Sequence, residues 1–136
     1  MGIFIGFDYL SEFRPYFELY QGNNGNQRLL CYVALERYTT ATKRNMVYDY
    51  GCQNDAARSM RVCGAKAGTR IRIYDDPYHR RHDDWTEILV KKDMVDNCET
   101  IDTFEKDKTY GNINVDYKTN GNLDGKVSSF AIDLGK

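Results

Sequence analysis

An internal repeat constrains the possible folds of this 136-residue chain more than any other feature. The first unit contains FELYQGNNG (17–25), then an apolar stretch, then NDAARSMRV (54–62). The second contains IRIYDDPY (71–78), another apolar stretch, and LDGKVSSFAI (123–132). Each unit starts with a short hairpin-like run around Tyr and ends with Asn or Asp a few residues before a Ser. The repeat predicts two similar units of short strands, and we expect the extra residues of the second within 91–110.

The remaining pattern is typical of an all-β protein. The chain has 11 Tyr and 6 Phe, and aromatic and β-branched residues favour pleated, half-buried surfaces. No 3.6-residue periodicity extends beyond about three helical turns. Clusters of Gly, Asn and Asp at 21–26 and 119–125 are typical of turns. Alternation between the turns predicts a sandwich or barrel of short strands within 14–20, 29–35, 46–50, 59–62, 69–74, 84–90, 100–104, 111–118 and 126–134.

Length and charge narrow the classes of partner. The length suits one domain with an ordinary core. The formal net charge of -1 gives no general attraction to nucleic acid or to an anionic membrane, so we expect no nucleic-acid partner. No stretch approaches the roughly 20 apolar residues that cross a bilayer as a helix, so we expect no membrane span.

The four cysteines, Cys31, Cys52, Cys63 and Cys98, leave two alternatives open. None forms a Cys-x-x-Cys pair, so a structural zinc site is not expected. They are either buried thiols of a reduced protein or members of disulfides. If a disulfide forms, we favour Cys31 with Cys52, because both flank the first half of the fold.

The two units, each ending in a similar arch, resemble the βγ-crystallin domain, and the chain looks like a microbial-type member. The resemblance is carried by 17–20 with 54–62 in the first unit and by 71–76 with 124–132 in the second. The joining stretch VCGAKAGTRIRIYDD (62–76) resembles the linker into the second crystallin motif.

The resemblance implies two Greek-key motifs packed as a βγ-crystallin-like sandwich. The domain would span 14–134, with motif one at 14–65 and motif two at 66–134. Residues 1–13 would form an N-terminal extension. This extension is rich in aromatic residues, so we expect it to dock on its own domain or to mediate oligomerisation or assembly with a partner.

The resemblance also implies calcium binding between the arches, here residues 54–59 and 124–129. In the family pattern an ion takes a main-chain carbonyl and a hydroxyl from one arch and a carboxylate or amide from the other. Carried over, one candidate calcium site consists of the Lys126 carbonyl, the Ser128 hydroxyl and the Asp55 carboxylate. Calcium accepts such mixed oxygen ligands.

A second, degenerate site would use the Ala56 carbonyl, Arg58 and Gly125. Arg58 has no acceptor atom and Gly125 has no side chain, so we expect this site to be lost. The alternative is that both arches are structural turns, in which Asn, Asp and Ser bond to nearby backbone groups.

Other motifs are weaker. HRRHDD (79–84) contains His79 and His82, which could hold a metal but are more typical of a solvated hairpin tip. No nucleophile elbow, phosphate-binding loop or His-Glu-x-x-His motif is present, so we expect no enzyme. A hydrolase would need a cleft with a perturbed carboxylate or His.

We therefore expect a non-enzymatic βγ-crystallin-like structural or binding protein with one possible calcium ion. The alternative is a recognition or assembly module that binds a carbohydrate or protein partner without metal. A glycan-binding protein should show an exposed aromatic platform. Trp85, the only Trp, is predicted on a buried strand, which disfavours glycan binding.

Overall fold

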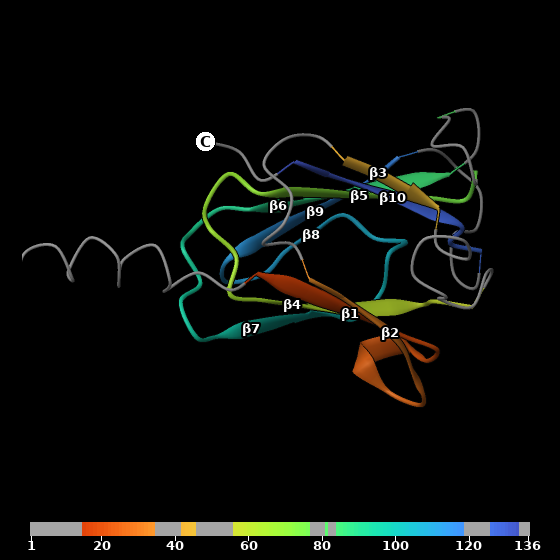
Figure 1. Cartoon of the computed structure of the whole chain (residues 1–136), viewed down its shortest axis with the longest axis horizontal. Coiled ribbons are helices and arrows are strands. Elements are labelled where there is room, and N and C mark those ends of the chain that lie inside the picture. Colours follow the sequence, from red (N-terminus) through yellow and green to blue (C-terminus); the bar gives the residue numbers. More distant parts are fainter. Residues whose placement is uncertain are drawn as a thin grey trace, which may run out of the picture.

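The computed structural model describes residues 15–34, 42–45, 56–76, 81, 84–118 and 126–133. These residues form two antiparallel β-sheets that lie face to face (Figure 1). The all-β prediction with two packed sheets is confirmed. The elements are β1 Tyr16–Tyr20, the 3-10 turn η1 Asn23–Gly25, β2 Leu29–Ala34, β3 Thr42–Asn45, β4 Ser59–Cys63, β5 Arg70–Tyr74, β6 Trp85–Val90, β7 Cys98–Ile101, β8 Lys108–Thr109, β9 Ile113–Lys118 and β10 Ser129–Asp133.

The two halves of the chain exchange one strand each. The four-stranded sheet has the order β2-β1-β4-β7, and the six-stranded sheet has the order β3-β10-β5-β6-β9-β8. Strand β3 comes from the first half but pairs with β10, whereas β7 comes from the second half but pairs with β4. Each sheet therefore depends on residues from both halves, and in Figure 1 β3 lies in the layer of β5 and β10.

The repeat is visible in the register of the strands. Tyr20 at the end of β1 lies opposite Ser59 at the start of β4. Tyr74 at the end of β5 lies opposite Ser129 at the start of β10. Counting from these two pairs gives equivalent positions in the two units. Those that are buried in both are Phe17 and Ile71, Leu19 and Ile73, Val33 and Ile88, Met60 and Phe130, and Val62 and Ile132.

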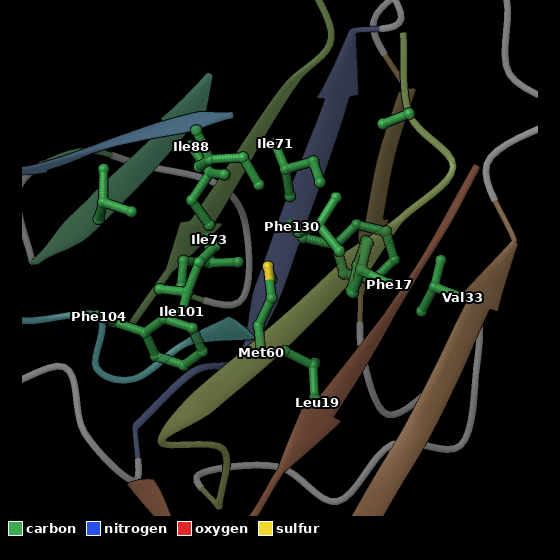
Figure 2. Close-up of a cluster of buried hydrophobic side chains, with 14 of the residues drawn as sticks. Phe17, Leu19, Val33, Met60, Ile71, Ile73, Ile88, Ile101, Phe104 and Phe130 are labelled. Carbon is green, nitrogen blue, oxygen red and sulfur yellow. The ribbon is translucent and has the colours of Figure 1, made fainter. Parts of the chain in front are cut away.

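The core fills the space between the sheets. Alternate residues of β1 and β5 point inward, as the period of two in YFELY and RIRIY predicts. Phe17 and Phe130, from opposite sheets, meet edge to face with ring centroids 5.3 Å apart (Figure 2). Both rings are fully buried, and burial of one such side chain stabilises the fold by about 1.5–3 kcal/mol.

The β1–β2 hairpin turns at the Gly and Asn cluster, as predicted. Asn24 and Gly25 have positive φ angles of 59° and 68°, which Gly and Asn adopt most readily. At Gly22 a Cβ atom would lie 2.9 Å from the Gln27 Cγ, so the close packing of this turn requires glycine.

Some predicted strand positions were wrong. The insertion was expected within 91–110, but the strands without a counterpart among the described residues of the first unit are β8 and β9, whose hairpin from Lys108 to Lys118 extends beyond residue 110. Strand β7 begins at Cys98 rather than at residue 100. Strand β3 lies at 42–45, in a polar stretch without alternation, and the strand predicted at 46–50 falls outside the described residues.

A disulfide joins Cys63 in β4 to Cys98 in β7. The thiol alternative is wrong for these two residues, because the strand exchange places Cys98 directly opposite Cys63. Cys31 is also disulfide-bonded. Cys52, its expected partner, lies outside the described residues.

Among the described residues, no helix is long and apolar enough to cross a membrane. Residues 1–13, expected to mediate docking or assembly, lie outside the part of the chain that the structure describes.

Candidate functional site

The two arches are attached to their hairpins in the same way. In the first unit the Arg58 N–H donates to the Tyr20 carbonyl at 2.9 Å, and in the second the Ser128 N–H donates to the Tyr74 carbonyl at 2.8 Å. Arg58 and Ser128 each directly precede the serine that starts the last strand of their unit. The repeated arch motif therefore corresponds to a repeated backbone geometry.

The serine that closes each arch is a structural anchor. The buried Ser59 hydroxyl donates to the Gly22 carbonyl at 2.6 Å and accepts from the Gly25 N–H at 2.8 Å. The buried Ser129 hydroxyl donates to the Asp76 carbonyl at 2.6 Å. These bonds tie each arch to the β-hairpin of its own unit and fix the residue just before the serine.

The second arch brings two predicted calcium ligands together. The Ser128 Oγ lies 3.4 Å from the Lys126 carbonyl oxygen, and Ser128 is only 4% exposed. A strong O–H···O bond spans about 2.5–3.0 Å, so this contact is long. Two oxygens that bind one Ca²⁺ at about 2.4 Å and at right angles lie about 3.4 Å apart. The contact is a long hydrogen bond from the Ser128 hydroxyl to the Lys126 carbonyl oxygen, and its length is compatible with two neighbouring calcium ligands.

The first arch lacks an equivalent pair of oxygens. Ala56 and Arg58 occupy the positions that correspond to Lys126 and Ser128. The Arg58 side chain is exposed and offers only donors. Ala56 can contribute only its carbonyl.

The remaining predicted site residues, Asp55 and Gly125, lie outside the described residues. Within the described part, no group of three or more His, Cys, Asp or Glu is arranged to hold a metal. The candidate calcium site has a carbonyl, a hydroxyl and one carboxylate. It therefore contains only one of these residue types and is not a group of this kind.

Tyr110 and Asp102 form a structural pair whose pKa values are both shifted. The Tyr110 hydroxyl donates to the Asp102 carboxylate. Burial, followed by this bond, raises the pKa of Tyr110 to about 12. The bond from Tyr110, together with Lys108 nearby, lowers the pKa of Asp102. Perturbed groups can mark active sites. Here the burial of Tyr110 and the bond between the two side chains account for the shifts, and the pair attaches the β8–β9 hairpin to the end of β7.

Two residues of the HRRHDD stretch, Arg81 and Asp84, are described in the structure, and both make packing contacts. Asp84 is buried and accepts a hydrogen bond from the Tyr117 hydroxyl at 3.1 Å. The Arg81 guanidinium lies 4.4 Å from the centre of the Trp85 ring, and the Lys118 Nζ lies 5.8 Å from it. Trp85 is 9% exposed, so it is not an open aromatic platform. His79 and His82 lie outside the described residues.

A tyrosine-rich surface on the outer face of the four-stranded sheet was not predicted from the sequence. Tyr16 and Tyr20 of β1 point away from the core, and Tyr32 of β2 lies beside Tyr16. Between them, Glu18 accepts from the Tyr20 hydroxyl at 2.8 Å and lies 3.9 Å from an Arg61 nitrogen. The alternation in YFELY indicated two outward tyrosines, but only the β1–β2 register places Tyr32 next to them.

Comparisons with protein-family models, with curated proteins and with solved structures found no match.

Proposed function

We propose that this chain is a non-enzymatic βγ-crystallin-like domain that binds one calcium ion between its arches. The observation that carries the proposal is the 3.4 Å spacing of the Ser128 Oγ and the Lys126 carbonyl oxygen. This pair lies on an arch whose backbone is anchored like that of its counterpart. Strand exchange supports a crystallin-like topology, because each sheet takes its outer fourth strand from the other half of the chain.

The roles of the residues follow from their chemistry. Ser128 and the Lys126 carbonyl supply neutral oxygens from the second arch, and Asp55 supplies the one carboxylate from the first. Bound calcium would supply a positive charge that links the two arches and stabilises the folded domain. With one carboxylate among the named ligands, the affinity is modest, because calcium affinity rises with ligand charge.

Calcium titration of the chelator-treated protein tests the proposal, with calorimetry for stoichiometry and thermal melting for stability. We expect one ion per chain and a stabilisation of about 2.7 kcal/mol at a hundredfold excess over Kd. Ser128→Ala and Asp55→Ala should each lower the affinity at least tenfold. Arg58→Ala is the matched control, since it changes the equivalent position of the degenerate site and should leave binding intact.

A gain-of-site variant makes the test sharper. Arg58→Ser combined with Gly125→Asp restores a hydroxyl and a carboxylate at the two defective positions of the second site. We expect the stoichiometry to rise from one calcium to two. Absence of both binding heat and a melting shift in the wild-type protein would contradict the proposal. Unchanged affinity in Ser128→Ala would also contradict it, because the ion would then lie elsewhere.

A further inference from the structure

The outer face of the four-stranded sheet carries an exposed aromatic surface. We call it the tyrosine face and define it as Tyr16, Glu18, Tyr20, Tyr32 and Arg61. Tyr32 is 54% exposed and lies in β2, the strand at one end of the four-stranded sheet. Its ring lies 4.9 Å from that of Tyr16, with 32° between the two planes. The two rings are therefore adjacent on this face, with Tyr32 exposed and Tyr16 partly buried.

The fold itself does not require Tyr16 and Tyr32. In the second unit, Arg70 lies at the position of Tyr16, Arg72 at that of Glu18, and Glu87 at that of Tyr32. Glu87 there receives hydrogen bonds from Arg70 at 2.9 Å and from Arg72 at 2.7 Å. The outer face of the six-stranded sheet is therefore stabilised by ion pairs. The outer face of the four-stranded sheet instead exposes aromatic area that no described contact covers fully.

Polar groups lie next to the rings. The Glu18 side chain is 17% exposed and the Arg61 side chain is 47% exposed, so both can be reached from solvent. The carboxylate accepts hydrogen bonds and the guanidinium donates them. Their charges are opposite, so the face can both donate and accept hydrogen bonds while these two side chains together carry no net charge.

This combination fits a pyranose ring. A pyranose has an apolar face of C–H groups that packs on a flat aromatic ring, and a rim of hydroxyls that both donate and accept hydrogen bonds. Tyrosine provides a rigid amphipathic surface of this kind. A few polar groups beside an apolar surface fix the orientation of a ligand. Because the charges of Glu18 and Arg61 balance, a neutral sugar suits the face better than an anionic one.

We propose that the tyrosine face binds a neutral polysaccharide, with one sugar ring stacked on Tyr32 and its hydroxyls bonded to Glu18 and Arg61. The proposal does not depend on calcium, because neither arch contributes a residue to this face. Tyr32 is the one exposed ring of the face, so a single sugar would make few contacts, and binding to a polymer with many repeated units is expected to be stronger than binding to a monosaccharide.

Affinity electrophoresis tests the proposal. The native protein is run through gels that contain soluble starch, galactomannan or hydroxyethyl cellulose as neutral probes, and carboxymethyl cellulose as an anionic probe. We expect retardation by at least one neutral polymer, unchanged by a calcium chelator. The apparent Kd should rise at least tenfold in Tyr32→Ala and severalfold in Arg61→Ala. Tyr32→Phe should retain most of the binding, because it keeps the ring.

Val95→Ala is the matched control, since Val95 is 40% exposed and lies outside the tyrosine face. Urea unfolding of each variant establishes that it is folded. The proposal is overturned if no neutral gel retards the protein or if only the anionic gel does. It is also overturned if Tyr32→Ala binds as strongly as the wild-type protein. It is also overturned if size-exclusion chromatography at two concentrations shows a dimer that Tyr32→Ala abolishes. That result would make the face a protein interface.

Discussion

The two repeated units are alike inside the molecule and different outside it. At the inward positions, an apolar residue of one unit corresponds to an apolar residue of the other, such as Leu19 and Ile73. At two outward positions, a tyrosine of the first unit corresponds to a charged residue of the second: Tyr16 to Arg70 and Tyr32 to Glu87. The difference indicates which side chains serve the fold and which are available for function.

The physical reason lies in the shared core. Both sheets contribute to one hydrophobic cluster, so the inward residues of each unit must pack against those of the other. An outward residue needs only to suit its strand neighbours and the solvent. The outer face of each sheet was therefore free to acquire its own chemistry.

The largest effects are expected at the inward positions. Phe17→Ala should destabilise the protein by about 3–5 kcal/mol and Ile71→Ala, its equivalent, by about 2–5 kcal/mol. Both residues are fully buried. Urea unfolding monitored by circular dichroism measures the loss. Tyr32→Ala, at an outward position, should change stability far less. If either core variant lost less than about 1 kcal/mol, the two units would not share equivalent inner faces.

The serines that anchor the arches should show an intermediate and unequal effect. Ser59→Ala removes one donated and one accepted hydrogen bond, whereas Ser129→Ala removes the bond to the Asp76 carbonyl. Leaving buried partners unsatisfied costs about 1–3 kcal/mol. We expect Ser59→Ala near the upper end of this range and Ser129→Ala near the lower end. The same unfolding measurement compares them, and a larger loss in Ser129→Ala would contradict the assigned contacts.

Much of the fold could be predicted because its main strands are local patterns. The stretches 14–20, 29–35, 84–90 and 111–118 contain β1, β2, β6 and β9, each of which has apolar alternation or a continuous apolar run. The exchanged strands were harder to predict. TKRN and CETI are short and largely polar, and their positions depend on the edge strands with which they pair.

The candidate sites also differ in whether the local sequence is enough to predict them. Lys126 and Ser128 are two residues apart, so a local motif was sufficient to identify them together. The Cys63–Cys98 disulfide and the contact of Tyr16 with Tyr32 depend on strand order, which spacing along the chain does not reveal. The same limit applies to Glu87, whose two arginine partners lie on the neighbouring strand.

The smallest effect is expected at the outer ion pairs. Glu87 bonds to Arg70 and Arg72 and its side chain is 18% exposed, whereas Glu18 lies 3.9 Å from Arg61. Partly exposed ion pairs contribute little, and salt weakens them. We expect Glu87→Gln to cost about 1 kcal/mol at low salt and less at high salt. Glu18→Gln should cost less than about 0.5 kcal/mol.

Urea unfolding at about 0.05 M and 1 M salt distinguishes the two faces, since screening shortens the Debye length to about 3 Å at the higher concentration. A strong salt dependence for Glu87→Gln with almost none for Glu18→Gln would mean that ion pairs stabilise only the outer face of the six-stranded sheet. Equal losses in the two variants would mean that Glu18 also serves the fold. Glu18 would then be a structural residue of the tyrosine face, and the contrast between the two outer faces would be confined to their aromatic side chains.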